Sequence, residues 1–137
     1  MTVDFFALRR GDVLPSVTFA MSGDEVRAYL DATGEAHDRW SELVPPLALG
    51  ALALGALMEQ LPLPSGALHA AQEFEFLAPV AHDARVEVQM SVAQQAVRAG
   101  STIVVIASVL ESGGEPVARA RSTVMAAAEA APGTVAS

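Results

Sequence analysis

The stretch from Leu43 to Met58 contains no charged residue, and it constrains the fold more than any other feature of the chain. Its sequence, LVPPLALGALALGALM, has two prolines near its start, which the first turn of a helix tolerates, and continues mostly in Leu, Ala and Gly. This composition predicts a helix that is apolar on every side, and in a soluble protein such a helix must be buried all round. The 16 residues fall short of the roughly 20 that a membrane span needs, so we expect no membrane insertion.

The composition limits the classes of function. The chain has 137 residues, which suits a single domain, and more than half of them are apolar while few are aromatic. The net charge of −8 argues against binding to nucleic acid or to anionic membranes. The absence of cysteine excludes disulfides, thiolate chemistry and cysteine zinc sites. The N-terminal sequence MTVDFFALRRGD lacks the features of a signal peptide, so we expect a cytoplasmic protein.

Two elements are predicted ahead of the uncharged stretch. Residues 17–21 read as a short strand. Ser22 and Glu25 form a capping box, which predicts the start of an amphipathic helix, and Gly34 is expected to end that helix. Residues 35–42 are polar and irregular. The apolar helix then begins at the two prolines and should end at the sequence PLPSG.

The remainder of the chain shows the alternating pattern of strands, at residues 73–76, 85–92, 101–110 and 117–125. We expect these four strands to form a meander, one curved antiparallel sheet with the apolar helix in its hollow. This α+β arrangement is the hot-dog fold, predicted here as one domain over residues 1–137 with a flexible tail from about residue 126. One such unit leaves part of the helix and a sheet edge uncovered, so a dimer is expected.

Two motifs carry a resemblance to a known family. The sequence Leu68-His69-Ala70-Ala71-Gln72-Glu73-Phe74-Glu75-Phe76, followed by the turn Pro79-Val80, resembles a strand and turn of MaoC-like hydratases and dehydratases of the N-terminal-half type. Val44-Pro45-Pro46 is similar to the Ala-Pro-Pro that begins the helix in that branch. His82-Asp83 replaces the family's Gly-Asp pair. The likeness extends from about Gly11 to Met125.

The resemblance implies activity on acyl thioesters carried by coenzyme A or by acyl carrier protein. Active members add water to a trans-2-enoyl thioester or remove it from an (R)-3-hydroxyacyl thioester, and no cofactor is implied. They use an Asp and a His, in the pattern Asp-x-Asn-Pro-(Ile/Leu)-His ahead of the helix, to hold a water and move protons. An N–H group at the start of the helix polarises the thioester carbonyl.

The matching residues of this chain depart from that pattern. With Gly34 aligned to the family's glycine, Glu35 stands at the Asp position and its carboxylate lies one methylene further out. His37 stands at the Asn position, and Trp40 stands at the His position, where an indole can only donate a hydrogen bond. Pro46 stands near the glycine that donates the N–H group, and proline has none. Glu35 and His37 are the candidate catalytic residues, as an altered pair on one water.

Substrate contacts are expected from five residues in and around the apolar helix: Trp40, Pro46, Leu47, Gly50 and Phe74. Gly50 would leave room for an acyl or pantetheine chain, or allow close packing of the sheet. Phe74 would line an acyl tunnel or pack in the core, while the alternating Glu73 and Glu75 read as a solvated face. His69 and His82 have no metal-ligand partner at usable spacing, so no metal is expected.

Three functions remain open at this point. The first is a hydratase or dehydratase that uses Glu35 and His37. The second is a non-catalytic subunit that pairs with another hot-dog chain and shapes its acyl pocket, so the partner is a second hot-dog subunit in a homodimer or a heterodimer. The third is a hot-dog thioesterase, for which Glu59 is the only carboxylate on the apolar helix and lies at the wrong end.

Overall fold

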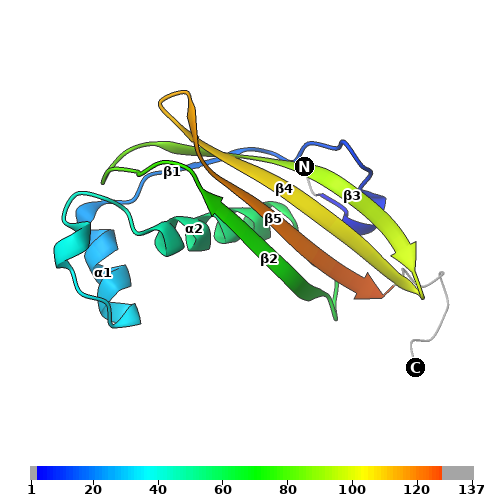
Figure 1. Ribbon diagram of the computed structural model, residues 1–137. Coiled ribbons are helices and arrows are strands. Elements are labelled where there is room, and N and C mark those ends of the chain that lie inside the picture. The colour runs from blue at the N-terminus through cyan, green and yellow to red at the C-terminus, as the bar shows by residue number, and fades with distance from the viewer. Residues whose placement is uncertain (1–2, 128–137) are drawn as a thin grey trace.

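The computed structural model describes residues 3–127 and shows one sheet with α2 on its inner side (Figure 1). In chain order the elements are η1 (Phe5–Ala7), β1 (Val17–Phe19), α1 (Gly23–Thr33), η2 (Asp38–Trp40), α2 (Pro46–Gln60), β2 (Leu68–Phe76), β3 (Val86–Arg98), β4 (Ser101–Ser112) and β5 (Glu115–Ala127).

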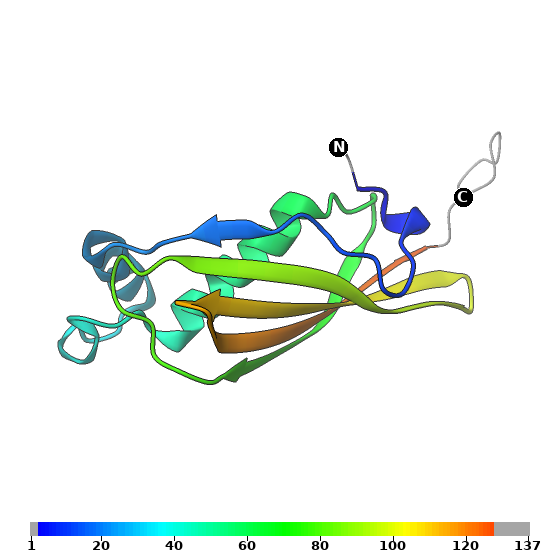
Figure 2. The ribbon, with the colours of Figure 1, turned by 90° about the horizontal axis from the view of Figure 1, so that it is seen from above.

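The five strands form one antiparallel sheet in the order β1-β3-β4-β5-β2. Tight turns at Ala99-Gly100 and Gly113-Gly114 join β3, β4 and β5 into a meander, and all four turn residues have positive φ. The sheet curves across α2, and α1 lies at one end of the molecule (Figure 2). This layout agrees with a sheet wrapped round one helix.

The predicted four-strand meander is wrong in one respect, the position of β2. Strand β2 pairs with β5 at the edge of the sheet and does not pair with β3. The connection over residues 77–85 is not a tight turn, because it pairs with the segment that precedes α2. The Val44 amide donates to the Val80 carbonyl at 2.8 Å, and Leu43 forms an isolated bridge with Ala81. Residues 77–85 therefore connect β2, at one side of the sheet, to β3, which lies beyond β4 and β5.

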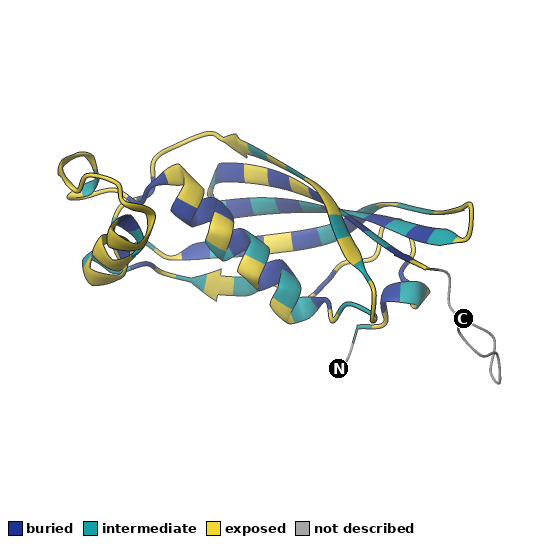
Figure 3. Cartoon of the chain, turned by 90° about the horizontal axis from the view of Figure 1, so that it is seen from below, coloured by how far each residue is buried: buried dark blue, intermediate teal, exposed yellow. Residues whose placement is uncertain are grey.

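Burial of α2 also differs from the sequence prediction. The helix has 15 residues and is buried along one side only, at Ala48, Leu49, Gly50, Ala53, Ala56 and Leu57. Leu47 is 62% exposed, and Ala51 and Gly55 are exposed as well. Figure 3 shows exposed residues along the side of α2 that faces away from the sheet. A long apolar helix enclosed on every side is therefore not observed, because one sheet reaches only one side of a helix. The exposed side is apolar, which is unusual for a helix in contact with water.

Local sequence signals act as expected in α1. The Ser22 hydroxyl accepts from the Glu25 amide and the Glu25 carboxylate accepts from the Ser22 amide, both at 3.1 Å, so the capping box is confirmed. Gly34 ends the helix with φ of 74°. Val26 and Leu30 are fully buried and fix the helix to the rest of the molecule.

Strand β5 extends through Ala127, so Ala126 and Ala127 of the expected tail belong to the sheet. The rest of that tail, from residue 128, lies outside the described residues. Within residues 3–127, neither α1 nor α2 combines the length and the apolarity that crossing a membrane requires.

Candidate functional site

Helix α2 begins on two prolines, and this leaves free backbone donors in its first turn. Pro45 is the N-cap residue and Pro46 the first helical residue, and neither has an N–H group. The first helical hydrogen bond runs from the Leu49 amide to the Pro45 carbonyl at 3.1 Å. In the described part of the chain, the Leu47 and Ala48 amides have no hydrogen-bond acceptor. They form the positive end of the helix dipole and can stabilise a developing negative charge.

Sequence reasoning missed these two donors because it considered only Pro46, which the resemblance puts near the family's glycine. The signal was present in the sequence. Two prolines fix the start of the helix, and the amides that follow them in the first turn then have no carbonyl within the helix to bind.

A small apolar cavity of about 60 Å³ lies beside this first turn. It is lined by Trp40, Leu43, Val44, Pro46, Leu49, Phe76, Ala78, Pro79 and Val80. Its walls come from the loop ahead of α2, from α2 itself, from the end of β2 and from the connection that follows β2. An acyl group can occupy such a surface, whereas a charged group would lose its hydration there.

His82 holds the loop that forms one wall of this cavity. Its Nε2 lies 3.0 Å from the Trp40 carbonyl oxygen and 3.1 Å from the Leu43 carbonyl oxygen. Carbonyl oxygens only accept, so Nε2 carries a proton and is shared between them. The His82 amide donates to the Glu42 carbonyl at 2.9 Å. The ring also packs against α1, where a Cβ on Gly23 would lie 3.1 Å from Nδ1. Its sequence position in a turn gave no indication of this role.

The two candidate catalytic residues lie in the exposed segment after α1. His37 Nε2 is 2.7 Å from Asp31 Oδ1, so the ring contacts this carboxylate. The Glu35 amide donates to the Leu30 carbonyl at 3.0 Å, and its carboxylate faces solvent near Tyr29. Burial, and secondly the Glu35 charge, raise the pKa of the Tyr29 phenol. Glu35 and His37 are not hydrogen-bonded to each other, and the altered catalytic pair stays a prediction.

Of the five predicted substrate contacts, the structure gathers four at the head of α2. Trp40 and Pro46 line the cavity. Gly50 lies against the ring of Phe74, and Phe74 in turn stacks on Phe76 in the cavity wall. Leu47 is the exception, because its side chain lies on the exposed side of α2 and does not line the cavity.

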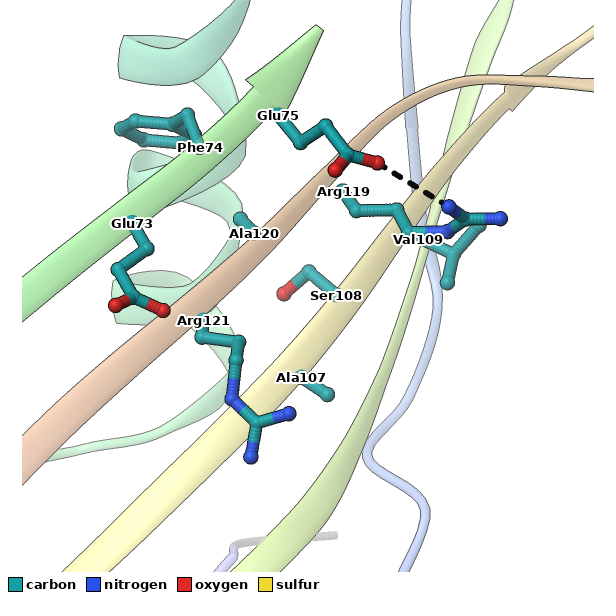
Figure 4. A pocket seen from close by; sticks show the side chains of 9 residues that line it. All are labelled: Glu73, Phe74, Glu75, Ala107, Ser108, Val109, Arg119, Ala120 and Arg121. Carbon is teal, nitrogen blue, oxygen red and sulfur yellow. Dashed lines mark hydrogen bonds and ion pairs between the residues drawn. The ribbon is translucent and has the colours of Figure 1, made fainter. Parts of the chain in front are cut away.

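A larger hollow of about 420 Å³ lies on the opposite face of the sheet, where Phe74 points away from it toward the helix (Figure 4). Glu73 and Glu75 line it from β2, and Arg119 and Arg121 from β5. Arg119 Nη1 and Glu75 Oε1 form an exposed ion pair at 3.2 Å. Glu73 and Glu75 are exposed, which agrees with the solvated face predicted from their alternation with phenylalanine.

No metal centre is formed by residues 3–127, in which no three His, Asp or Glu side chains gather closely enough to hold an ion.

The sequence model of one protein family, described as FAS1-like, dehydratase domain region, matches residues 11–120. No curated protein matches the sequence. Among solved structures, the fold is similar to an (R)-hydratase from A. caviae involved in PHA biosynthesis, with 20% identity, a TM-score of 0.73, and coverage of 86% of this chain and 96% of that one. A MaoC-like dehydratase from Rhodospirillum rubrum gives 18% identity and a TM-score of 0.76, covering 93% of this chain and 100% of that one.

The HadBC complex of Mycobacterium tuberculosis, a 3R-hydroxyacyl-ACP dehydratase, is also similar. It gives 20% identity and a TM-score of 0.70, with 92% of this chain and 100% of that one covered. At these identities the likeness to solved structures concerns the fold, and the predicted hot-dog class is confirmed.

Proposed function

Because the chain belongs to the family of FAS1-like dehydratase domain regions, we propose that it is one subunit of an acyl-thioester hydratase or dehydratase whose acid–base pair comes from a second hot-dog chain. The resemblance to MaoC-like hydratases and dehydratases that the sequence motifs indicate is confirmed by this family and by the structural neighbours.

One observation carries the proposal, the chemistry at the head of α2. The Leu47 and Ala48 amides are suited to polarising a thioester carbonyl, and the adjoining cavity is apolar. Both nearby imidazoles already have other partners. His82 Nε2 lies within hydrogen-bond distance of two carbonyl oxygens, and His37 contacts the Asp31 carboxylate. The resemblance puts Trp40 at the family's histidine position, and an indole cannot take up a proton at neutral pH. The site therefore resembles the part of an active site that binds the thioester, without the groups that transfer protons.

Addition or removal of water moves one proton and one hydroxyl group and transfers no electrons. The proposed reaction therefore needs a positioned base and acid but no redox cofactor. In the proposed complex, the present chain orients the thioester and the second chain holds the water.

The surface next to α2 supports a second hot-dog chain as the partner. The exposed side of α2 carries Leu47, and Leu68, Phe76 and Leu77 are exposed on and just after β2. Within residues 3–127, no strand pairs with the outer edge of β2, because β5 occupies its other edge. Two of the structures that share this fold are complexes by name, HadBC and ChsH1–ChsH2 of M. tuberculosis.

Hydration of crotonyl-CoA, followed by loss of the enoyl absorbance, tests this proposal. The purified chain is assayed alone and after co-expression with a hot-dog chain that carries Asp-x-Asn-Pro-x-His. We expect turnover from the complex only, and no effect of Glu35→Gln or His37→Gln in this chain. Turnover by the chain alone that Glu35→Gln abolishes would instead favour the altered pair. A stable homodimer that binds no second hot-dog chain and shows no turnover would contradict both.

Release of free CoA from saturated acyl-CoA substrates separates these functions from a thioesterase. Glu59 lies in the last turn of α2, at the far end from the free amides, so we expect no release.

A further inference from the structure

We propose that Phe74 and Phe76 close the inner end of the cavity at the head of α2, so that this subunit accepts only short acyl groups. The inference rests on the proposed function, because it assigns the acyl part of the thioester to that cavity.

The ring of Phe74 is wedged against the backbone of α2 at Gly50. A Cβ built on Gly50 would lie 3.1 Å from Cζ of Phe74, 3.2 Å from Cε1 and 3.3 Å from Cε2. Three ring atoms therefore occupy the space that a side chain at position 50 would need, and glycine is what admits the ring. Gly50 is buried, so the contact is part of the packed interior.

Phe76 connects the packed ring of Phe74 to the cavity wall. The centroids of the Phe74 and Phe76 rings are 5.7 Å apart with an interplanar angle of 15°, so the two rings stack. Phe76 lines the cavity together with Trp40 and Pro46. Phe74 lies behind it along β2 and packs against Gly50. Phe76, backed by Phe74, therefore forms the inner wall of the cavity.

The volume in front of this wall is small. An apolar cavity of about 150 Å³ holds one benzene molecule, whereas the cavity here measures about 60 Å³. It has room for the end of a short acyl chain and not for an extended one. The stack thus decides how far an acyl chain can advance between α2 and β2.

The path behind the stack is also limited, by a polar group. Gln72 is the next residue on the same face of β2, and its Oε1 accepts from the Ser122 hydroxyl at 2.6 Å and lies 3.0 Å from His69 Nε2. Two residues of a strand span about 7 Å. Removal of the Phe74 ring would therefore lengthen the apolar path by about that distance and no further, since Gln72 is held in place.

The test measures the affinity of acetyl-, butyryl-, hexanoyl-, octanoyl- and dodecanoyl-CoA by isothermal titration calorimetry, with the chain together with any hot-dog subunit that copurifies. Phe74→Ala is compared with the wild-type protein, and Phe74→Val serves if the alanine variant does not fold. Phe5→Ala is the matched control, because Phe5 is a buried phenylalanine of η1 that does not line the cavity.

In the wild-type protein and in Phe5→Ala, we expect affinity to stop rising after butyryl-CoA. In Phe74→Ala it should continue to rise through octanoyl-CoA, by about fourfold for each newly buried methylene. Affinity that rises with chain length in the wild-type protein, or an identical profile in Phe74→Ala, would overturn the inference while leaving the proposed function intact. Failure of every thioester to bind either protein would overturn the proposed function and the inference with it.

Discussion

The Nε2 atom of His82 lies 3.0 Å from the carbonyl oxygen of Trp40, and this contact ties the loop ahead of α2 to the connection that follows β2. The two residues are 42 positions apart in the chain. His82 thus holds the backbone at Trp40, and the indole of Trp40 forms part of the cavity wall.

Replacement of His82 by phenylalanine should destabilise the fold. The variant keeps a ring of similar size but leaves the Trp40 and Leu43 carbonyls without their donor, which we expect to cost about 1–3 kcal/mol of unfolding free energy. Urea denaturation measures the change. His37→Phe is the matched control, because that ring is on the surface, and it should change stability by less than about 0.5 kcal/mol. Equal effects of the two substitutions would contradict the role given to His82.

Replacement by alanine should change the stability of the fold in opposite directions at two glycines of α2. Gly50→Ala places a methyl group against the Phe74 ring and should cost about 1–3 kcal/mol through overpacking. Gly55→Ala meets nothing within 4 Å and should gain up to about 1 kcal/mol from helix propensity.

A double-mutant cycle shows whether the Gly50 effect acts through Phe74. In the Phe74→Val background the extra methyl group finds space, so Gly50→Ala should become close to neutral there. If Gly50→Ala lowers the free energy of unfolding equally in that background and in the wild-type protein, the packing of Phe74 against Gly50 is not the cause.

The local elements of this fold could be predicted because short-range signals determine them. Ser22, Glu25 and Gly34 set the limits of α1 by backbone hydrogen bonds within a few residues, and the Gly113-Gly114 pair sets the β4–β5 turn. Other features depend on contacts between distant segments. No local signal in the sequence predicts that β2 pairs with β5. The same is true of the contact between His82 and the Trp40 carbonyl.

The burial of α2 could not be predicted for a different reason. A helix of Ala, Leu and Gly has no polar side, so its sequence does not show which side the sheet covers. The free Leu47 and Ala48 amides, by contrast, could have been predicted, because the two prolines that precede them fix the start of the helix.

The single tyrosine of the chain allows a direct test of the electrostatics around Glu35. Burial, and then the Glu35 charge, raise the pKa of Tyr29 above its ordinary value of 10.0. The folded state therefore holds the phenolic proton more tightly than the unfolded chain. The stability that this contributes is complete below the unfolded pKa and is lost as the pH rises through the folded pKa.

Titration of phenolate absorbance reports this group alone, since no other tyrosine is present. Glu35→Gln should lower the pKa of Tyr29 while leaving it above 10.0, because burial is the larger cause. Glu42→Gln, which removes another exposed carboxylate, should leave the titration unchanged. An unaltered midpoint in Glu35→Gln would show that the Glu35 carboxylate does not lie close to the phenol.

A charge on the exposed side of α2 should weaken association with a second hot-dog chain. Leu47 is 62% exposed in the first turn of the helix, so Leu47→Glu should change the stability of the isolated chain by less than about 0.5 kcal/mol. Covered by a partner, the same carboxylate would be buried without a counter-ion, and association should weaken by at least about tenfold. Sedimentation velocity of the purified protein over a range of concentrations measures this. Val13→Glu is the control, because Val13 is 78% exposed but lies beside β3, at the other side of the sheet. If Val13→Glu dissociates the assembly and Leu47→Glu does not, the partner binds the β1–β3 side instead of α2.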